Sequence, residues 1–262
     1  MGSRCWAFTS GDYWFRVVAR GLVRGGDLSS LGGAWVVGLG IGFEEFPRLL
    51  RGWGIEYEDV SGSAHVFRTY RLRLAGGGEV ALIASAGGGG YAEAVAAMAS
   101  EAGVKALVGV GLCGALGEGL KVGDVVIPTG CVREDGVTGK YVGPGYPAVP
   151  DYGLLKRLES SLRGEGLNPI PGLVVTTSST FREGRDWAEG LWRVGALCVE
   201  CEAAVIMTLA RLCRVPAAVA LVVSDSVVRG EEAFSWGELR VRLKESLAKT
   251  LRAALEAAGL TP

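Results

Sequence analysis

Runs of β-branched and other apolar residues alternate along the chain with segments whose apolar residues recur every three or four positions. The runs are apolar throughout rather than at every second residue, which is typical of strands buried on both faces of a sheet. This pattern predicts strands over residues 34–39, 66–74, 80–85, 106–110, 124–133, 172–177, 197–200 and 217–223. It predicts helices over residues 13–24, 43–53, 91–102, 151–164, 202–213 and 236–258. The sequence therefore predicts an α/β fold.

The last predicted helix repeats leucine every four residues, which predicts one apolar stripe packed against the core. The stripe consists of Leu239, Leu243, Leu247, Leu251 and Leu255. The only long irregular stretch, residues 134–150, contains several Gly and Pro residues, and loops of this length are often lids or binding loops. Because no internal repeat or break in composition marks a boundary, we expect a single domain over residues 1–262.

Bulk charge and hydropathy exclude several classes of function. The 262 residues carry a formal net charge of −1 and are 49% hydrophobic, so nothing indicates binding to nucleic acid or to a membrane surface. No apolar run approaches the roughly 20 residues that a bilayer requires, and no leader pattern opens the chain. We expect a soluble, cytoplasmic protein.

The six cysteines are scattered, mostly within apolar segments, which favours buried thiols over a metal site. Cys198 and Cys201 form a C-x-x-C pair, but no second pair completes a set of four ligands. The chain has no Gln and a single Asn, Asn168, and such depletion of thermolabile amides is one mark of heat-adapted proteins. A thermophilic source would also permit an intracellular disulfide.

The 42 glycines are about twice the average share, and they gather where predicted strands end. A G-x-G-x-G run at Gly38, Gly40 and Gly42 follows the first strand, and Glu58 stands near the position of a ribose-binding acid. The dinucleotide fingerprint requires G-x-G-x-x-G, so this spacing disfavours a nicotinamide site. The glycines instead indicate close approach of backbone to some other ligand.

Carboxylates follow two of the predicted strands. Glu200 and Glu202 are two residues apart, so in extended backbone they point to the same side and can accept hydrogen bonds from sugar hydroxyls. The alternative is an ordinary helix start, where acidic residues are also favoured. Asp225 ends the next strand; in an apolar cleft its pKa would rise and it would serve as a proton donor, whereas the alternative is a cap for a turn. His65, the only histidine, has no triad partners nearby in sequence, which disfavours a hydrolytic triad.

Together these segments resemble the nucleoside phosphorylase and nucleosidase superfamily, the branch with uridine phosphorylase, hexameric purine nucleoside phosphorylase and methylthioadenosine nucleosidase. The resemblance runs from about Trp35 to the last helix and rests on GLCGA at 111–115, LKVGDVV at 120–126, TSSTF at 177–181, VECEAA at 199–204 and VSD at 223–225. It implies a single-domain three-layer fold around a mixed, partly barrel-like sheet flanked by helices.

The resemblance also implies a role for each matching residue. Glu200 and Glu202 match the positions that hold the ribose hydroxyls, Cys201 matches a residue under the sugar, and Asp225 matches the acid that protonates a purine. On the base side it implies Phe181, which stacks on the base, together with Arg185, Cys113 and Gly114. On the phosphate or water side it implies Gly40, Gly88, Leu112, His65 and Arg68.

The chain departs from the phosphorylase pattern at the phosphate site. Gly109 and Leu112 stand where the phosphorylases have an arginine and a Thr or Ser, and His65 aligns with an arginine supplied by a neighbouring subunit. Each lost guanidinium contact removes roughly 1.5 to 3 kcal/mol, so phosphate binding should be weakened. In the nucleosidase branch an early acidic cluster positions water, and residues 42–46 resemble it with Glu45 as candidate general base; residues 235–239 resemble the segment after its catalytic acid.

Three functions therefore stay open. Phosphorolysis of a nucleoside is the first, hydrolysis with Glu45 as base is the second, and a nucleoside-binding protein without catalysis is the third. A purine substrate is favoured because Arg185 and Trp187 replace the uracil-reading pair of uridine phosphorylases. The resemblance implies no cofactor, inorganic phosphate as co-substrate, and a homo-oligomer, hexameric for a phosphorylase or dimeric for a nucleosidase.

Overall fold

The structure is a computed structural model that describes residues 5–8, 12–42, 44–73, 79–233 and 237–259. Its strands are β1 (Ala34–Leu39), β2 (Tyr57–Asp59), β3 (Phe67–Arg73), β4 (Glu79–Ser85), β5 (Ala106–Ala115), β6 (Val125–Glu134), β7 (Ile170–Thr177), β8 (Ala196–Glu200), β9 (Ala217–Ser226) and β10 (Glu231–Glu232). Its α-helices are α1 (Asp12–Leu22), α2 (Glu45–Gly52), α3 (Gly89–Glu101), α4 (Tyr152–Gly164), α5 (Arg185–Arg193), α6 (Ala203–Leu212) and α7 (Glu238–Ala257). Four short 3₁₀ helices also occur, η1 (Arg24–Gly26), η2 (Leu28–Leu31), η3 (Thr138–Lys140) and η4 (Thr180–Arg182).

The ten described strands form one mixed sheet in the order β10-β9-β6-β7-β8-β5-β1-β4-β3-β2. A further pairing of β9 with β5 closes β5, β9, β6, β7 and β8 into a ring, which is the predicted barrel-like part. Strands β1, β4, β5 and β9 run parallel to their neighbours in this part of the sheet. Their carboxyl ends therefore lie along one edge, where open α/β sheets bind ligands.

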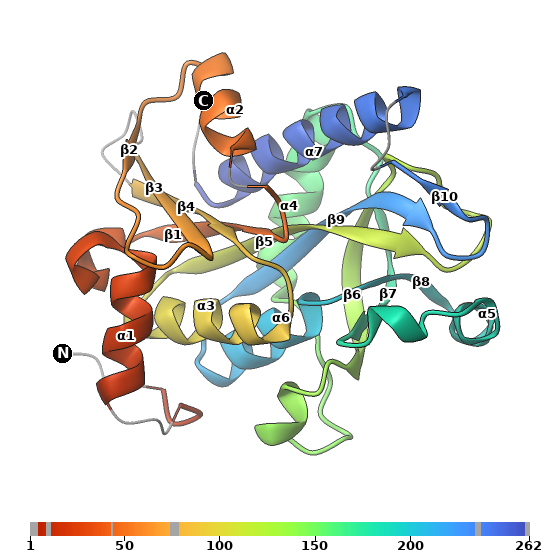
Figure 1. Cartoon of the computed structure of the whole chain (residues 1–262), viewed down its shortest axis with the longest axis horizontal. Helices are drawn as coiled ribbons and strands as arrows, with labels where there is room; N and C mark the ends of the chain where they lie inside the picture. The colour runs from red at the N-terminus through yellow and green to blue at the C-terminus, as the bar shows by residue number, and fades with distance from the viewer. Residues whose placement is uncertain (1–4, 9–11, 43, 74–78, 234–236, 260–262) are drawn as a thin grey trace.

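Helices cover both faces of the sheet, as the fully apolar strands predicted (Figure 1). Helices α1, α3 and α6 contribute to one buried cluster, which includes Trp35, Met98 and Ile206. Helices α2, α4 and α7 contribute to a second, which includes Phe46 and Leu251, and α5 contributes Ala188 to a smaller third cluster. The α/β architecture with three layers is confirmed.

Most predicted elements are present, with shifts of a few residues at their ends. Strands β5 and β9 continue three or more residues further than predicted, and β2, β10 and α5 were not predicted. The prediction of a buried leucine stripe along the whole of α7 was wrong at its start, because Leu239 is exposed whereas Leu251 and Leu255 are fully buried. A four-residue spacing advances about 40° per step around a helix, so the stripe rotates away from the core. The predicted ends at Phe43, Leu74 and Trp236 lie outside the described residues, as does Ser235 of the motif at 235–239.

Two of the six cysteines depart from the expectation of buried free thiols. Cys5 and Cys213 form a disulfide that joins the N-terminal segment to the end of α6. Cys113 and Cys198 are buried free thiols, as predicted, while Cys131 and Cys201 are half-buried. The C-x-x-C pair is thus unbridged, and the disulfide joins residues 208 positions apart.

The stretch 134–150 is held in place by its own polar contacts. Buried Asp135 accepts hydrogen bonds from the backbone N–H groups of Val137 (2.8 Å) and Thr138 (2.6 Å). Arg133 donates to the Thr138 hydroxyl (3.1 Å) and to the Gly143 carbonyl (3.1 Å). None of the described helices combines the length and the apolar character needed to cross a membrane.

Candidate active site

Glu200 ends β8 and organises the first turn of α6. One carboxylate oxygen accepts the backbone N–H groups of Glu202 and Ala203, both at 2.7 Å, and the other contacts the Thr176 hydroxyl. The side chain is buried, and the Thr176 hydroxyl also accepts the N–H of Ala204. Both oxygens of Glu200 are thus engaged by the protein, so this residue positions the turn that carries Glu202.

Burial and the nearby Glu202 carboxylate raise the pKa of Glu200 to about 8, against hydrogen bonds from Thr176, Glu202 and Ala203 that favour the charged form. A carboxyl group whose pKa is raised by folding binds its proton more tightly in the folded state. The free energy of unfolding should therefore fall as pH rises from about 4.5 to about 8, with a slope of at most ~1.4 kcal/mol per pH unit from this group.

This prediction is checked with Glu200→Gln, which keeps an acceptor for the two N–H groups but does not titrate. Urea unfolding between pH 5 and 9 should show a flatter pH dependence for the variant than for the wild type. Asp225 titrates in both proteins, and because Glu200 and Glu202 interact, the difference reports the ionisation of Glu200 together with its effect on Glu202. Identical slopes would place the ionisation of Glu200 outside this range.

Glu202 stands at the start of α6 and reaches across to the loop after β4. Its Oε1 accepts the backbone N–H of Gly88, and burial raises its pKa. Gly88 has a φ of 109°, which a side chain rarely adopts. Gly87 in the same loop contacts Gly40 after β1: a Cβ on Gly87 would lie 3.4 Å from the Gly40 Cα. The two glycine loops and Glu202 therefore meet at one point of the sheet edge.

Asp225 is half-buried near the end of β9, directly opposite Gly114 of β5. Its Oδ1 accepts the Ser224 hydroxyl at 2.6 Å. A Cβ on Gly114 would lie 2.8 Å from Oδ2 of Asp225, so a larger residue at position 114 would displace this oxygen. Burial raises the pKa of Asp225, and the charge of Glu232, its cross-strand neighbour on β10, raises it further.

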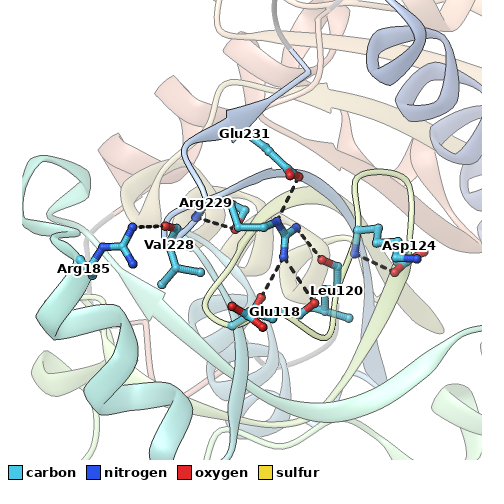
Figure 2. Close-up of polar contacts among 10 residues, drawn as sticks. Glu118, Leu120, Asp124, Arg185, Val228, Arg229 and Glu231 are labelled. Atoms are coloured by element: carbon cyan, nitrogen blue, oxygen red, sulfur yellow. Dashed lines mark hydrogen bonds and ion pairs between the residues drawn. The ribbon is translucent and has the colours of Figure 1, made fainter.

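Two arginines fix the segment that follows Asp225 (Figure 2). Arg229 donates to the carbonyl of Leu120 at 2.8 Å and to those of Gly117 and Glu118 at 3.4 Å, and it pairs with Glu231 at 3.1 Å. Arg185 donates to the Val228 carbonyl at 2.6 Å, and its predicted contact with the base stays a prediction. Both guanidinium groups hold backbone, so they position the Asp225 turn.

Sequence reasoning missed three residues of this region. Thr176 is the second-to-last residue of β7 and contacts Glu200, Arg229 anchors the turn after Asp225, and the half-buried Glu183 has its pKa raised by burial and by the charge of Asp225. A polar residue at the end of each buried strand is the signal that would have identified Thr176. Arg229 and Glu183 carry no such signal, because their partners are distant in sequence.

The remaining residues predicted to contact the sugar, the base or the phosphate are spread along the same edge of the sheet. Cys201 is half-buried next to Glu202, with its sulfur 4.0 Å from the Thr180 hydroxyl, whereas Phe181 in the same 3₁₀ segment is fully exposed. Cys113 is buried, and Leu112 packs against the cluster that contains α2 and α7. At the other end of the edge, His65 is exposed and Arg68 is half-buried on β3.

The carboxylate of Glu45 makes two ion pairs within the chain. One oxygen lies 2.7 Å from Arg48, one turn along α2, and the other lies 3.3 Å from Lys244 of α7. Both oxygens are thus engaged on the face of the sheet opposite to α6. An acidic residue in the first turn of a helix is common for structural reasons alone. Its role as a general base stays a prediction.

Within the described residues, no group of three His, Cys, Asp or Glu side chains could hold a metal ion. The site instead combines the buried carboxyl groups of Glu200 and Glu202, glycine backbone and the half-buried carboxyl group of Asp225. Residues 34–257, which include all of these groups, match the Phosphorylase superfamily. The chain belongs to this superfamily.

Curated relatives match part of the chain. It is 31% identical over 160 residues to a guanosine phosphorylase of Halorubrum lacusprofundi, covering 60% of this chain and 66% of the relative. It is 35% identical over 157 residues to a DeoD-type purine nucleoside phosphorylase of Bacillus thuringiensis, covering 59% of this chain and 66% of that protein. The chain thus spans slightly less than two thirds of the length of these relatives.

Solved structures of this superfamily share the fold. A uridine phosphorylase of Vibrio fischeri matches with a TM-score of 0.78 at 17% identity, covering 88% of this chain and 93% of that one. A purine nucleoside phosphorylase of Toxoplasma gondii in complex with immucillin-H matches with a TM-score of 0.74 at 18% identity, covering 88% and 93%. The predicted superfamily and its fold are confirmed.

Proposed function

We propose that the protein cleaves the N-glycosidic bond of a purine nucleoside by phosphorolysis, which gives the free base and ribose 1-phosphate. The observation that carries this proposal is the placement of Glu202 and Asp225 at one sheet edge of a phosphorylase-superfamily chain. The names of two relatives, a guanosine and a purine nucleoside phosphorylase, support a purine base. The reaction needs no cofactor beyond inorganic phosphate as co-substrate, and we place it in the cytoplasm.

Glu202 is the residue that we assign to the ribose hydroxyls. Its Oε1 already accepts the Gly88 N–H, and its position beside the glycine loops leaves the carboxylate next to the sheet edge. Cleavage of the bond between C1′ and nitrogen develops positive charge on the ribose, and a nearby carboxylate stabilises that charge. Glu200 supports this role indirectly, because it fixes the backbone of Glu202.

Asp225 is the residue that we assign to the base. Burial raises the pKa of Asp225, which favours its protonated form, and we assign to it the proton that the purine receives as the bond breaks. Proton donation neutralises the leaving base. The Ser224 hydroxyl occupies Oδ1, which leaves Oδ2, beside Gly114, for the substrate.

The nucleophile belongs where the glycine loops after β1 and β4 meet. Gly40 and Gly87 lie close together there, and the lack of side chains on these glycines leaves room for an anion. The side chain of Arg68 is the cation that we assign to phosphate, because it stands on β3 beside β4. Hydrolysis is the second candidate, and the two ion pairs of Glu45 weigh against its proposed base.

The experiment that tests this function measures release of free base from inosine, adenosine, guanosine, uridine and methylthioadenosine, with and without phosphate, at moderate and elevated temperature. We expect purine release that depends on phosphate and yields ribose 1-phosphate. Release without phosphate would replace phosphorolysis by hydrolysis. Absence of release from every nucleoside would favour a binding protein.

Glu202→Gln should raise KM and lower kcat for ribosides more than for 2′-deoxyribosides. The physical reason is that a carboxylate accepts a hydrogen bond from the 2′-hydroxyl more strongly than an amide does, by about 1 kcal/mol or more. Steady-state kinetics on inosine and 2′-deoxyinosine measure the difference. Equal losses on both substrates would remove Glu202 from the 2′-hydroxyl.

A further inference from the structure

The starts of helices α3 and α6 meet at the candidate site. The two helices lie side by side on one face of the sheet (Figure 1). Gly88 directly precedes α3, Glu202 directly precedes α6, and the hydrogen bond from the Gly88 N–H to Oε1 of Glu202 joins the two helix starts. The spacing between these starts therefore sets the position of the Glu202 carboxylate.

A third segment, the turn after β6, packs against both helix starts. A Cβ on Gly89, the first residue of α3, would lie 3.0 Å from Cγ2 of Val137 in this turn and 3.6 Å from Cγ2 of Val205 on α6. The carbonyl oxygen of Asp135 would lie 3.7 Å from the same point. Val205 is fully buried and follows Glu202 by three residues, which is about one turn of α6. Val137 thus fills the space that a side chain on Gly89 would occupy, where α3 and α6 come together.

The turn that carries Val137 is fixed by a buried carboxylate. One oxygen of Asp135 accepts the N–H groups of Val137 and Thr138 at 2.8 and 2.6 Å, and the other accepts the Thr138 hydroxyl at 2.7 Å. That hydroxyl in turn accepts a hydrogen bond from Arg133 at 3.1 Å. A buried network whose members all have partners is rigid, so the turn holds the Val137 side chain in one place.

A second contact attaches the same segment to α3 one turn further on. The Tyr141 hydroxyl donates to Oε1 of Glu93, which follows Gly89 by four residues and so lies on the same side of α3. Val137 and Tyr141 flank the 3₁₀ helix η3 on its two sides. Residues 137–141 are therefore held along α3 at two successive turns.

We propose that Val137 is a positioning residue for Glu202: its side chain sets the spacing between the starts of α3 and α6 and so keeps the Gly88 N–H on the carboxylate. Packed side chains transmit small displacements, because protein interiors contain few voids. A carboxylate with one oxygen held by an N–H keeps a fixed orientation toward a ligand at its other oxygen. The consequence for the sugar rests on the proposed function, whereas the consequence for the Gly88 hydrogen bond does not.

The test uses two complementary substitutions. Val137→Ala removes the methyl groups beside Gly89 and leaves a gap, whereas Gly89→Ala adds a methyl group that forces Val137 to move by a few tenths of an ångström. Position 89 is helical, so its backbone accepts alanine. In the double variant the added methyl group enters the space that Val137→Ala vacates, and we expect the spacing of the two helices to be restored.

Hydrogen exchange at the Gly88 amide, resolved by mass spectrometry, reports this hydrogen bond without any reaction. We expect the amide to be protected in the wild type and to exchange at least roughly 5-fold faster in each single variant, since a hydrogen bond to a charged group is weakened. The double variant should recover most of the protection. Val142→Ala is the matched control and should leave exchange unchanged, because Val142 is half-buried in the same loop but lines a hollow whose walls all come from residues 131–147.

Kinetics on inosine and 2′-deoxyinosine provide the second measurement. Each single variant should lose more kcat/KM on the riboside than on the 2′-deoxyriboside, and the double variant should regain the wild-type ratio. Partial unfolding would instead lower both values equally, and circular dichroism and a thermal melt of each variant measure it directly.

Two results would overturn the proposal. One is an unchanged exchange rate of the Gly88 amide in both folded single variants, and the other is a double variant whose losses are the sum of the single ones. Faster exchange in the single variants, restored in the double variant, would support the positioning of Glu202 even if no variant and no wild-type protein cleaved a nucleoside. In that case only the proposed reaction would fail.

Discussion

Asp225→Asn should lower kcat for purine nucleosides by roughly 100-fold or more, the contribution of a well-placed general acid. The side chain is half-buried, its pKa is raised by burial, and the amide of Asn cannot supply the proton that the leaving base requires. Steady-state phosphorolysis of inosine and guanosine measures the loss. The change is nearly isosteric, so Oδ1 still meets Ser224 and the Gly114 contact is preserved.

Two comparisons separate proton donation from simple damage to the site. A riboside with a leaving group that needs no protonation, such as a nitrophenyl riboside, should be cleaved by Asp225→Asn at nearly the wild-type rate. For purine nucleosides, wild-type activity should fall as pH rises through the raised pKa of Asp225, and the variant should lose this dependence. Equal losses on both kinds of substrate would show that Asp225 binds or orients the base without protonating it.

The fold could be predicted from local patterns because the central strands of the sheet, such as β1, β4, β5 and β9, are almost entirely buried. Strand β1 is apolar over its whole length and β9 from Ala217 to Val223, and the helices between them are long enough to show their period. Strand β2 was missed because it is only three residues long and mostly exposed, whereas α5 has apolar residues at helical spacing and was overlooked. Register and the closure of β9 onto β5 depend on contacts between distant segments.

The candidate site could be predicted only where residues follow strand ends. Glu200, Glu202 and Asp225 were identified in this way, and the structure brings them to the same edge. The difference between Glu200 and Glu202 could not be predicted. Glu200 accepts the N–H groups of Glu202 and Ala203, a contact that exists only in the folded turn. The hydrogen bond from Arg185 to the Val228 carbonyl could not be predicted either, because the two residues are 43 positions apart in sequence.

The disulfide between Cys5 and Cys213 should contribute a large part of the thermal stability. It closes a loop with a sequence separation of 208, and a cross-link of that length removes conformational entropy from the unfolded chain worth about 5 kcal/mol in the chain-entropy estimate. It also holds Phe8, whose ring packs edge-to-face on Phe15 and Tyr141, against the core. We therefore expect Cys5→Ser to lower Tm by roughly 10 °C or more.

Differential scanning calorimetry with and without reductant separates this effect from the loss of the side chain itself. Reductant should lower the Tm of the wild type by nearly as much as Cys5→Ser does, and it should leave the Tm of Cys5→Ser and Cys213→Ser unchanged. Cys201→Ser is the matched control, because Cys201 is a half-buried free thiol, and this variant should keep the wild-type response to reductant. Counting of free thiols would confirm that the reductant has cleaved the bond. If the Tm of the wild type is then unchanged, packing of the N-terminal segment, rather than the covalent link, stabilises this end of the molecule.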